Sequence, residues 1–108
     1  MNLFRTVIEA KCVTLVENGV SLFPDAPTKR GQRHVRSLAN RIQYGHRAAI
    51  IFVVQRADAN AFSLNYKSDP AFCQEINTAI TEGLEVYAYK CNMNSNKIDL
   101  GPQIPVQL

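Results

Sequence analysis

The first hydrophobic segment of the chain predicts a strand over residues 7–16. Branched and apolar side chains dominate this segment, and side chains on a strand point alternately to its two faces. Asn18 and Gly19 follow, and both accept the positive φ angles of a tight hairpin turn. A short return strand is therefore predicted over residues 20–23, ended by Pro24.

The spacing of apolar residues changes to a helical period over residues 29–44. Thr28 is placed to cap the start of this helix, and Gly45 can close its end in the left-handed conformation. Most basic side chains of the segment lie off the apolar stripe, which is typical of a helix that packs by one face. The stripe consists of Val35, Leu38 and Ile42.

A second strand and a second helix are predicted further along the chain. Residues 48–54 are continuously apolar, as expected of a strand that is covered on both faces. A loop is predicted over residues 56–68. Asp69 then caps a helix that has Pro70 in its first turn and Gly83 after its end. The buried face of this helix is predicted to comprise Phe72, Ile76, Ala79 and Ile80.

The remaining sequence predicts a strand over residues 84–91, a polar connection over residues 92–97, and one or two short edge strands over residues 98–108. Strands and helices therefore alternate along the chain. This order predicts an α/β fold with a mixed central sheet flanked by two main helices. With 108 residues, the chain is expected to form a single domain.

The composition agrees with a soluble globular protein, with 46% hydrophobic and 19% charged residues. No apolar run reaches the roughly 20 residues that cross a bilayer, and no signal-peptide core follows the first residues. We therefore expect a cytoplasmic protein without a membrane association. Cys12, Cys73 and Cys91 form no CxxC pair and are predicted to be buried, reduced thiols.

Positive charge is concentrated in the first half of the chain. Residues 1–56 contain nine basic and three acidic residues, whereas residues 57–108 contain three basic and six acidic residues. Such asymmetry favours an anionic partner, for which nucleic acid is the usual candidate. An ordinary solvated helix surface produces the same pattern, so the charge by itself leaves both interpretations open.

Glu9 and Lys11 are the first candidate site residues. On a strand, residues two apart project from the same face with Cα atoms roughly 7 Å apart. A carboxylate beside an ammonium group suits phosphodiester hydrolysis, where the carboxylate helps to hold Mg²⁺ and the lysine orients water or stabilises charge. The alternative is a simple ion pair on a half-exposed sheet, and three residues do not distinguish the two.

A second group of candidates surrounds the start of the first helix. Asp25 lies between two prolines that limit where its carboxylate points. Arg30, Arg33 and His34 follow near the free N–H groups of the helix start, a combination that suits phosphate binding. Gly31 allows another backbone or a ligand to approach closely. A capped helix with a solvated basic face is the structural alternative.

Several stretches together resemble the sugar fermentation stimulation protein family. Residues 8–15 resemble its E-x-K-x-x-T-L segment, and residues 23–34 resemble its F-P-D-A-x-T-x-R-G-x-x-H segment. Residues 45–56, 62–63 and 85–89 match further blocks in the same order. The resemblance covers nearly the whole chain.

The resemblance implies a restriction-endonuclease-like, or PD-(D/E)xK, core, with Glu9 and Lys11 as the ExK acid and lysine. Family members add an N-terminal OB-like domain thought to bind DNA, and they are described as regulators of sugar metabolism genes. Residues 1–108 are therefore expected to be the C-terminal nuclease-like domain, truncated at the N-terminus and without the OB-like domain. The family's other metal-binding aspartate precedes the ExK segment, but no acidic residue precedes Glu9 here.

These observations predict a nucleic-acid-associated domain, DNA-binding by its resemblance, that is linked to transcription regulation. If it is an enzyme, it is a nuclease that depends on Mg²⁺ or Mn²⁺; the alternative is a non-enzymatic regulatory domain with a degenerate nuclease site. An open sheet edge would favour a homodimer. The predicted metal ligands are Glu9 and Asp25, the catalytic residues are these two and Lys11, and the nucleic-acid contacts are Arg30, Arg33 and His34.

Overall fold

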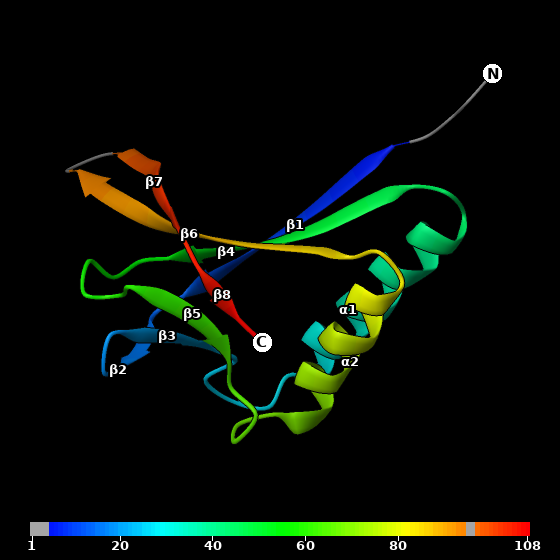
Figure 1. Cartoon of the computed structure of the whole chain (residues 1–108), viewed down its shortest axis with the longest axis horizontal. Helices are drawn as coiled ribbons and strands as arrows, with labels where there is room; N and C mark the ends of the chain where they lie inside the picture. Colours follow the sequence, from blue (N-terminus) through cyan, green and yellow to red (C-terminus); the bar gives the residue numbers. More distant parts are fainter. Residues whose placement is uncertain (1–4, 95–96) are drawn as a thin grey trace.

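The computed structural model describes the backbone of residues 5–94 and 97–108, and the side chains of residues 5–91 and 100–108 (Figure 1). Eight strands and two helices lie within these ranges. In chain order they are β1 (Thr6–Val13), β2 (Leu15–Glu17), β3 (Val20–Phe23), α1 (Lys29–Gln43), β4 (Arg47–Val54), β5 (Ala61–Leu64), α2 (Pro70–Thr81), β6 (Glu85–Asn94), β7 (Lys97–Ile104) and β8 (Val106–Gln107).

The strands form two four-stranded sheets. The first sheet has the order β1-β4-β6-β7, in which β1, β4 and β6 are parallel and β7 is antiparallel. The second sheet has the order β2-β3-β5-β8 and is also mixed. The predicted mixed α/β fold with two main helices is confirmed, and the second sheet is an addition to it.

Three local predictions were wrong, and each error concerns where strands begin and end. The predicted loop over residues 56–68 contains β5, whose partners are β3 and β8. The predicted strand over residues 7–16 is divided after Val13, because its two parts belong to different sheets. In the predicted connection over residues 92–97, β6 continues to Asn94 and β7 begins at Lys97. Residues 95–96 lie outside the described part of the chain.

Both helices begin and end where their caps predict. The Thr28 hydroxyl accepts a hydrogen bond from the Gly31 N–H at 2.9 Å, and Asp69 accepts one from the Phe72 N–H at 3.0 Å. Gly45 and Gly83 follow the two helices with φ angles of 91° and 118°. Neither helix, nor any other in the described residues, is long and apolar enough to span a membrane.

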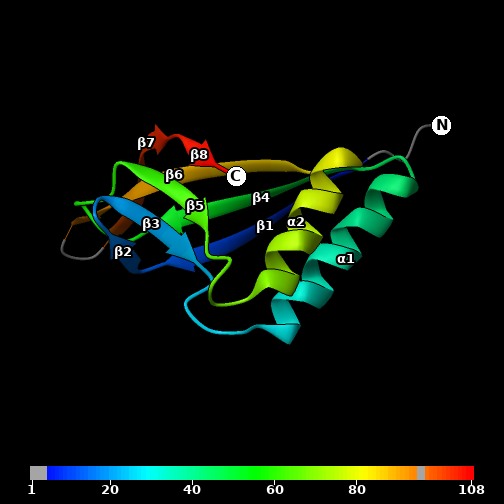
Figure 2. The same ribbon diagram turned by 60° about the horizontal axis from the view of Figure 1, so that its bottom comes forward.

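The hydrophobic core lies between one face of the first sheet and the elements that pack on this face, which are the two helices and the second sheet. Phe52 on β4 is fully buried, and its ring contacts Phe23 of β3 and Phe62 of β5, with ring centroids 5.4 Å and 4.2 Å apart. Phe72 of α2 packs on Phe23 from the helix side. The helices and the second sheet therefore cover the same face of the first sheet, as Figure 2 shows.

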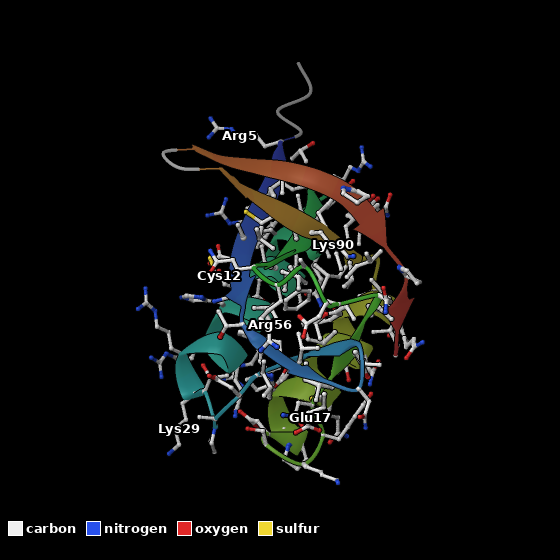
Figure 3. The ribbon with its side chains drawn as sticks, turned by 90° about the vertical axis from the view of Figure 1, so that its left-hand side faces the viewer. Arg5, Cys12, Glu17, Lys29, Arg56 and Lys90 are labelled. Carbon is white, nitrogen blue, oxygen red and sulfur yellow. The ribbon has the colours of Figure 1, made fainter. Side chains whose placement is uncertain are left out.

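The cysteines divide between core and surface. Cys73 and Cys91 are buried and free, as predicted, and burial raises the pKa of the Cys73 thiol to about 11. The prediction was wrong for Cys12, which is exposed because it points to the uncovered face of β1. Figure 3 shows its side chain at the surface.

Candidate nucleic-acid interface

Glu9 and Lys11 lie on the covered face of β1, where α1 passes over them. Their strand partners are Ile50 and Phe52, which are both buried, and this register fixes the face from which they project. Strand β1 is at the edge of the first sheet, so this part of the face is only partly covered. A charged pair can remain in contact with water here, which the centre of the sheet would not allow.

His34 of α1 joins this pair. Its Nδ1 atom lies 2.9 Å from Lys11 Nζ and 3.4 Å from Glu9 Oε1, while Lys11 Nζ lies 3.8 Å from Glu9 Oε1. The three side chains therefore form one group, here called the Glu9–Lys11–His34 cluster. The structure thus unites two predicted catalytic residues with a predicted phosphate contact that lies 23 positions further along the chain.

The cluster holds the lysine ammonium in place. Because an ammonium group only donates hydrogen bonds, Lys11 is the donor in its contact with His34 Nδ1. The Lys11 side chain is 16% exposed, whereas Glu9 is 37% exposed. The methylene groups of Lys11 are therefore largely buried, and the ammonium group points at the Glu9 carboxylate and the His34 ring.

Arg30 and Arg33 are exposed near the start of α1, four and one positions before His34 respectively. Within the described residues, neither guanidinium forms an ion pair. Arg36, one turn further on, is engaged with Glu75 of α2 at 2.8 Å. Figure 3 shows Lys29 at the start of α1, directed away from the protein. The helix start therefore presents cationic groups beside the cluster.

Asp25 is exposed in the loop between β3 and α1. This loop is fastened to the connection between β5 and α2, because the Asn65 N–H and side-chain amide donate to the carbonyls of Phe23 and Pro24 at 2.8 and 2.9 Å. Across the residues described, no three His, Cys, Asp or Glu side chains gather closely enough to hold a metal ion. Asp25 therefore does not complete a three-ligand group with Glu9 and His34, and its metal role stays a prediction.

Asp69 does more than the sequence predicts. Besides capping α2, its carboxylate accepts hydrogen bonds from the Thr28 N–H at 2.8 Å and the Gln32 side-chain amide at 3.2 Å. The backbone N–H of Thr28 is the main reason that the pKa of Asp69 lies below its ordinary value. One buried carboxylate therefore joins the starts of both helices and fixes where α1 presents its basic residues.

Gly31 serves packing within the protein. A Cβ atom at this position would lie 2.9 Å from the Thr28 side chain and 3.1 Å from the Phe72 ring. The groups that approach Gly31 closely are therefore the Thr28 cap and the Phe72 ring of α2. The possibility that the missing side chain admits a ligand has no support in this arrangement.

The residues of the cluster do not by themselves fit a divalent metal ion. Mg²⁺ and Ca²⁺ take six or more oxygen ligands, of which the protein commonly supplies several. Glu9 offers one carboxylate, and the ammonium group of Lys11 stands 3.8 Å from it. Any ion at Glu9 would therefore need oxygen ligands from outside the cluster.

The described residues form an α/β domain with an acid and a lysine on an edge strand, faced by a basic helix start. The family described as "Sugar fermentation stimulation protein RE domain" matches residues 2–97. The chain belongs to this family.

Comparison with individual relatives supports the same family assignment. The sugar fermentation stimulation protein homolog of Desulforamulus reducens is 47% identical over 104 residues, which are 96% of this chain and 44% of the relative. That of Chloroflexus aurantiacus is 42% identical over 93% of this chain and 39% of the relative. The solved structure of Pyrococcus furiosus SfsA in complex with Ca²⁺ matches with a TM-score of 0.88 at 29% identity, over 95% of this chain and 45% of that one. The chain thus spans less than half the length of these relatives.

Proposed function

We propose that this domain binds nucleic acid, with DNA as the first candidate, through the start of α1 and the Glu9–Lys11–His34 cluster. The observation that carries the proposal is the position of Lys11, whose ammonium is held 2.9 Å from His34 of α1, the helix that also carries the exposed Arg30 and Arg33. Guanidinium groups pair with phosphate oxygens in a bidentate way, and an ammonium group binds them as a point charge.

The same proposal assigns the domain a place in regulation of sugar metabolism. Its support is the family name, which the relatives share. A DNA-binding domain acts in regulation by occupying a site, and cleavage is not needed for that. We propose the cytoplasm as the place where this binding occurs. A homodimer through β1, the edge strand of the first sheet, is a compatible arrangement.

Replacing Arg30 and Arg33 together by alanine is expected to weaken DNA binding and to reduce its salt dependence. Each phosphate contact contributes about −0.9 to the slope of log K against log salt concentration. The slope should therefore be shallower by about 2 in the double variant. Fluorescence anisotropy with a labelled duplex at several salt concentrations measures this. Arg41→Ala, at the far end of the same helix, is the matched control; equal weakening by this variant would contradict a defined interface.

The second candidate function is a nuclease that depends on Mg²⁺ or Mn²⁺, and the Ca²⁺ bound by the Pyrococcus furiosus relative favours a divalent ion in the family. The ligands present in this chain count against it. Glu9 is one carboxylate, and Asp25 does not join it in a three-ligand group. We therefore propose that the nuclease site is degenerate in this chain and that nucleic-acid binding persists without cleavage.

Incubation of the chain with single- and double-stranded DNA and RNA in Mn²⁺ is expected to give no cleavage, because the cluster lacks ligands for the ion. Glu9→Gln should behave identically, and both proteins should still bind DNA in EDTA. Cleavage by the parent chain that disappears in Glu9→Gln would contradict this expectation. The Asp25→Asn variant would then show whether Asp25 supplies the missing ligand.

A further inference from the structure

Charged residues gather at the edge of the first sheet where its parallel strands end. Arg56 and Asp58 follow β4, and Lys90 of β6 is paired with Val54, the last residue of β4. These three residues, Arg56, Asp58 and Lys90, are called the sheet-end group. Figure 3 views the molecule from this edge, with Arg56 near the middle. Ligands of α/β sheets commonly bind beyond the carboxyl ends of the strands, so the group lies where a binding site is expected.

Arg56 is held by two partners. Its Nε and Nη2 groups donate to the two carboxylate oxygens of Asp58, at 3.0 and 2.6 Å, and its Nη1 group donates to the Thr14 carbonyl at 3.4 Å. This fork of two parallel hydrogen bonds is the geometry in which a guanidinium binds a carboxylate or a phosphate. The guanidinium is therefore already oriented for two acceptor oxygens on one group.

The sheet-end group has an excess of positive charge. It contains two cations and one carboxylate, and Lys90 itself donates to the Ala57 carbonyl at 3.2 Å. Hydrogen bonds from Arg56 chiefly, and the charge of Lys90 to a smaller extent, hold the pKa of Asp58 below its ordinary range. Asp58 is therefore ionised at neutral pH, and one positive charge of the group remains for a second anion.

The pair of Arg56 and Asp58 is open to water, with side chains that are 44% and 54% exposed. Exposed ion pairs contribute little to the stability of a fold, because water screens them. Asp58 can therefore turn into the solvent when another anion takes its place, and the fold does not depend on the pair. A phosphate group offers the guanidinium the same two acceptor oxygens.

The sheet-end group continues the proposed interface along β1. Thr14, which Arg56 contacts, follows Lys11 by three residues, which is roughly 10 Å at the spacing of an extended chain. Phosphates follow one another at about 3.4 Å of helix axis along each DNA strand, so one strand can contact both groups. A nucleic-acid backbone that reaches Lys11 from the start of α1 can therefore reach Arg56 beyond the end of β1.

We propose that Arg56, supported by Lys90, binds phosphate groups, and that Asp58 occupies this site until a phosphate displaces it. The inference rests on the proposed function for one source of phosphate, the backbone of DNA; a free phosphate ligand has the same chemistry. In the displacement, the hydrogen bonds of Arg56 Nε and Nη2 pass from Asp58 to phosphate oxygens, and no proton is transferred. Asp58 thereby acts as a built-in competitor that lowers the affinity of the domain for phosphate.

Inorganic phosphate tests the site without DNA. Two-dimensional NMR follows the Nε–H signal of Arg56 while phosphate replaces chloride at constant ionic strength. The signal is expected to shift saturably. The phosphate concentration at half-saturation should be about threefold lower in Asp58→Asn, the factor that corresponds to the loss of an exposed ion pair. The Nε–H group of Arg47, which donates to Glu85 at the opposite end of β4, is the internal control, and its signal should not shift.

Absence of an Arg56 shift in both the parent chain and Asp58→Asn overturns the proposal, whether or not the chain binds DNA. An equal shift of the Arg47 signal also overturns it, since phosphate would then act on any exposed guanidinium group.

Fluorescence anisotropy with a labelled duplex then identifies the source of the phosphate. Arg56→Ala should make the slope of log K against log salt concentration shallower by about 1, the share of one phosphate contact. Asp58→Asn should tighten DNA binding about threefold. This gain should vanish when Arg56→Ala is added, because the two residues act on one contact. Glu17→Gln removes another exposed carboxylate and is the control for the loss of a negative charge.

Equal tightening by Asp58→Asn with and without Arg56, or equal tightening by Glu17→Gln, overturns the displacement, because a general effect of charge then explains it. A saturable Arg56 shift with inorganic phosphate, in a chain that does not bind the duplex, supports the phosphate site and contradicts the proposed function. The ligand is then a free phosphate compound, and the two failures are told apart.

Discussion

Replacement of Phe52 by alanine is expected to destabilise the protein by about 4 kcal/mol, the middle of the range for large-to-small changes of buried aromatic residues. Phe52 is completely buried at the point where the two sheets meet. Its ring stacks on Phe62 with a centroid distance of 4.2 Å and an interplanar angle of 20°, and it contacts Phe23 at 5.4 Å. The deletion therefore leaves a cavity between elements that cannot all move to fill it.

Urea unfolding followed by circular dichroism measures this effect as a lower transition midpoint at an unchanged slope. Phe52→Leu should lose less stability, because the leucine side chain fills part of the space. Tyr44→Ala is the surface control: Tyr44 is 82% exposed, and its removal should change the free energy of unfolding by less than about 0.5 kcal/mol. A loss below about 1 kcal/mol for Phe52→Ala would mean that the contact between the sheets is not a rigid part of the core.

Asp69→Ala is expected to reduce the free energy of unfolding by about 3 kcal/mol, and it should do so without creating a large cavity. Loss of the α2 cap contributes roughly 1 kcal/mol, and leaving the Thr28 N–H and Gln32 amide without their acceptor contributes roughly 2 kcal/mol more. Asp69 is 4% exposed, so water cannot readily replace the missing oxygen atoms. Asp69→Asn keeps one acceptor oxygen and should lose less.

The charge of Asp69 also makes a predictable contribution to acid stability. Its pKa is below the ordinary value in the folded protein, chiefly through the Thr28 N–H. A group with a lowered folded pKa stabilises the protein above its unfolded pKa, and this stabilisation is lost as the pH falls through the folded pKa. Stability should therefore fall below about pH 4, the ordinary range of aspartate, and the fall should be shallower in Asp69→Asn.

Urea unfolding between pH 7 and pH 2 measures this decrease in the free energy of unfolding at acid pH. Glu85 contributes to it as well, because its hydrogen-bonded ion pair with Arg47 lowers the pKa of Glu85 to about 2. In the Glu85→Gln variant this contribution of Glu85 is absent, so the pH dependence that remains is compared with and without Asp69→Asn. If the free energy of unfolding decreased equally with falling pH in the parent protein and in Asp69→Asn, the role assigned to this carboxylate would be contradicted.

The sequence by itself determined the elements whose signals are local. The helix of residues 29–44 was predicted from its apolar stripe, its threonine cap and the glycine after it, and α1 runs from Lys29 to Gln43. The cap and proline at Asp69 and Pro70 placed the start of α2 in the same way. Such signals act between neighbours three or four positions apart, so they can be identified from the sequence without knowledge of the rest of the fold.

Tertiary structure decided everything that depends on residues far apart in the chain. Strand β5 has four residues and is stable only because β3 and β8 pair with it, so the sequence around it predicted a loop. His34 meets Lys11 across 23 positions, and Asp69 meets Thr28 across 41. The sequence indicated Glu9 and Lys11 as one pair on a strand face, and it indicated His34 separately, among the phosphate contacts of the helix start. Only the packing of α1 over the edge of the first sheet brings them together, because non-local contacts follow from topology and not from local spacing.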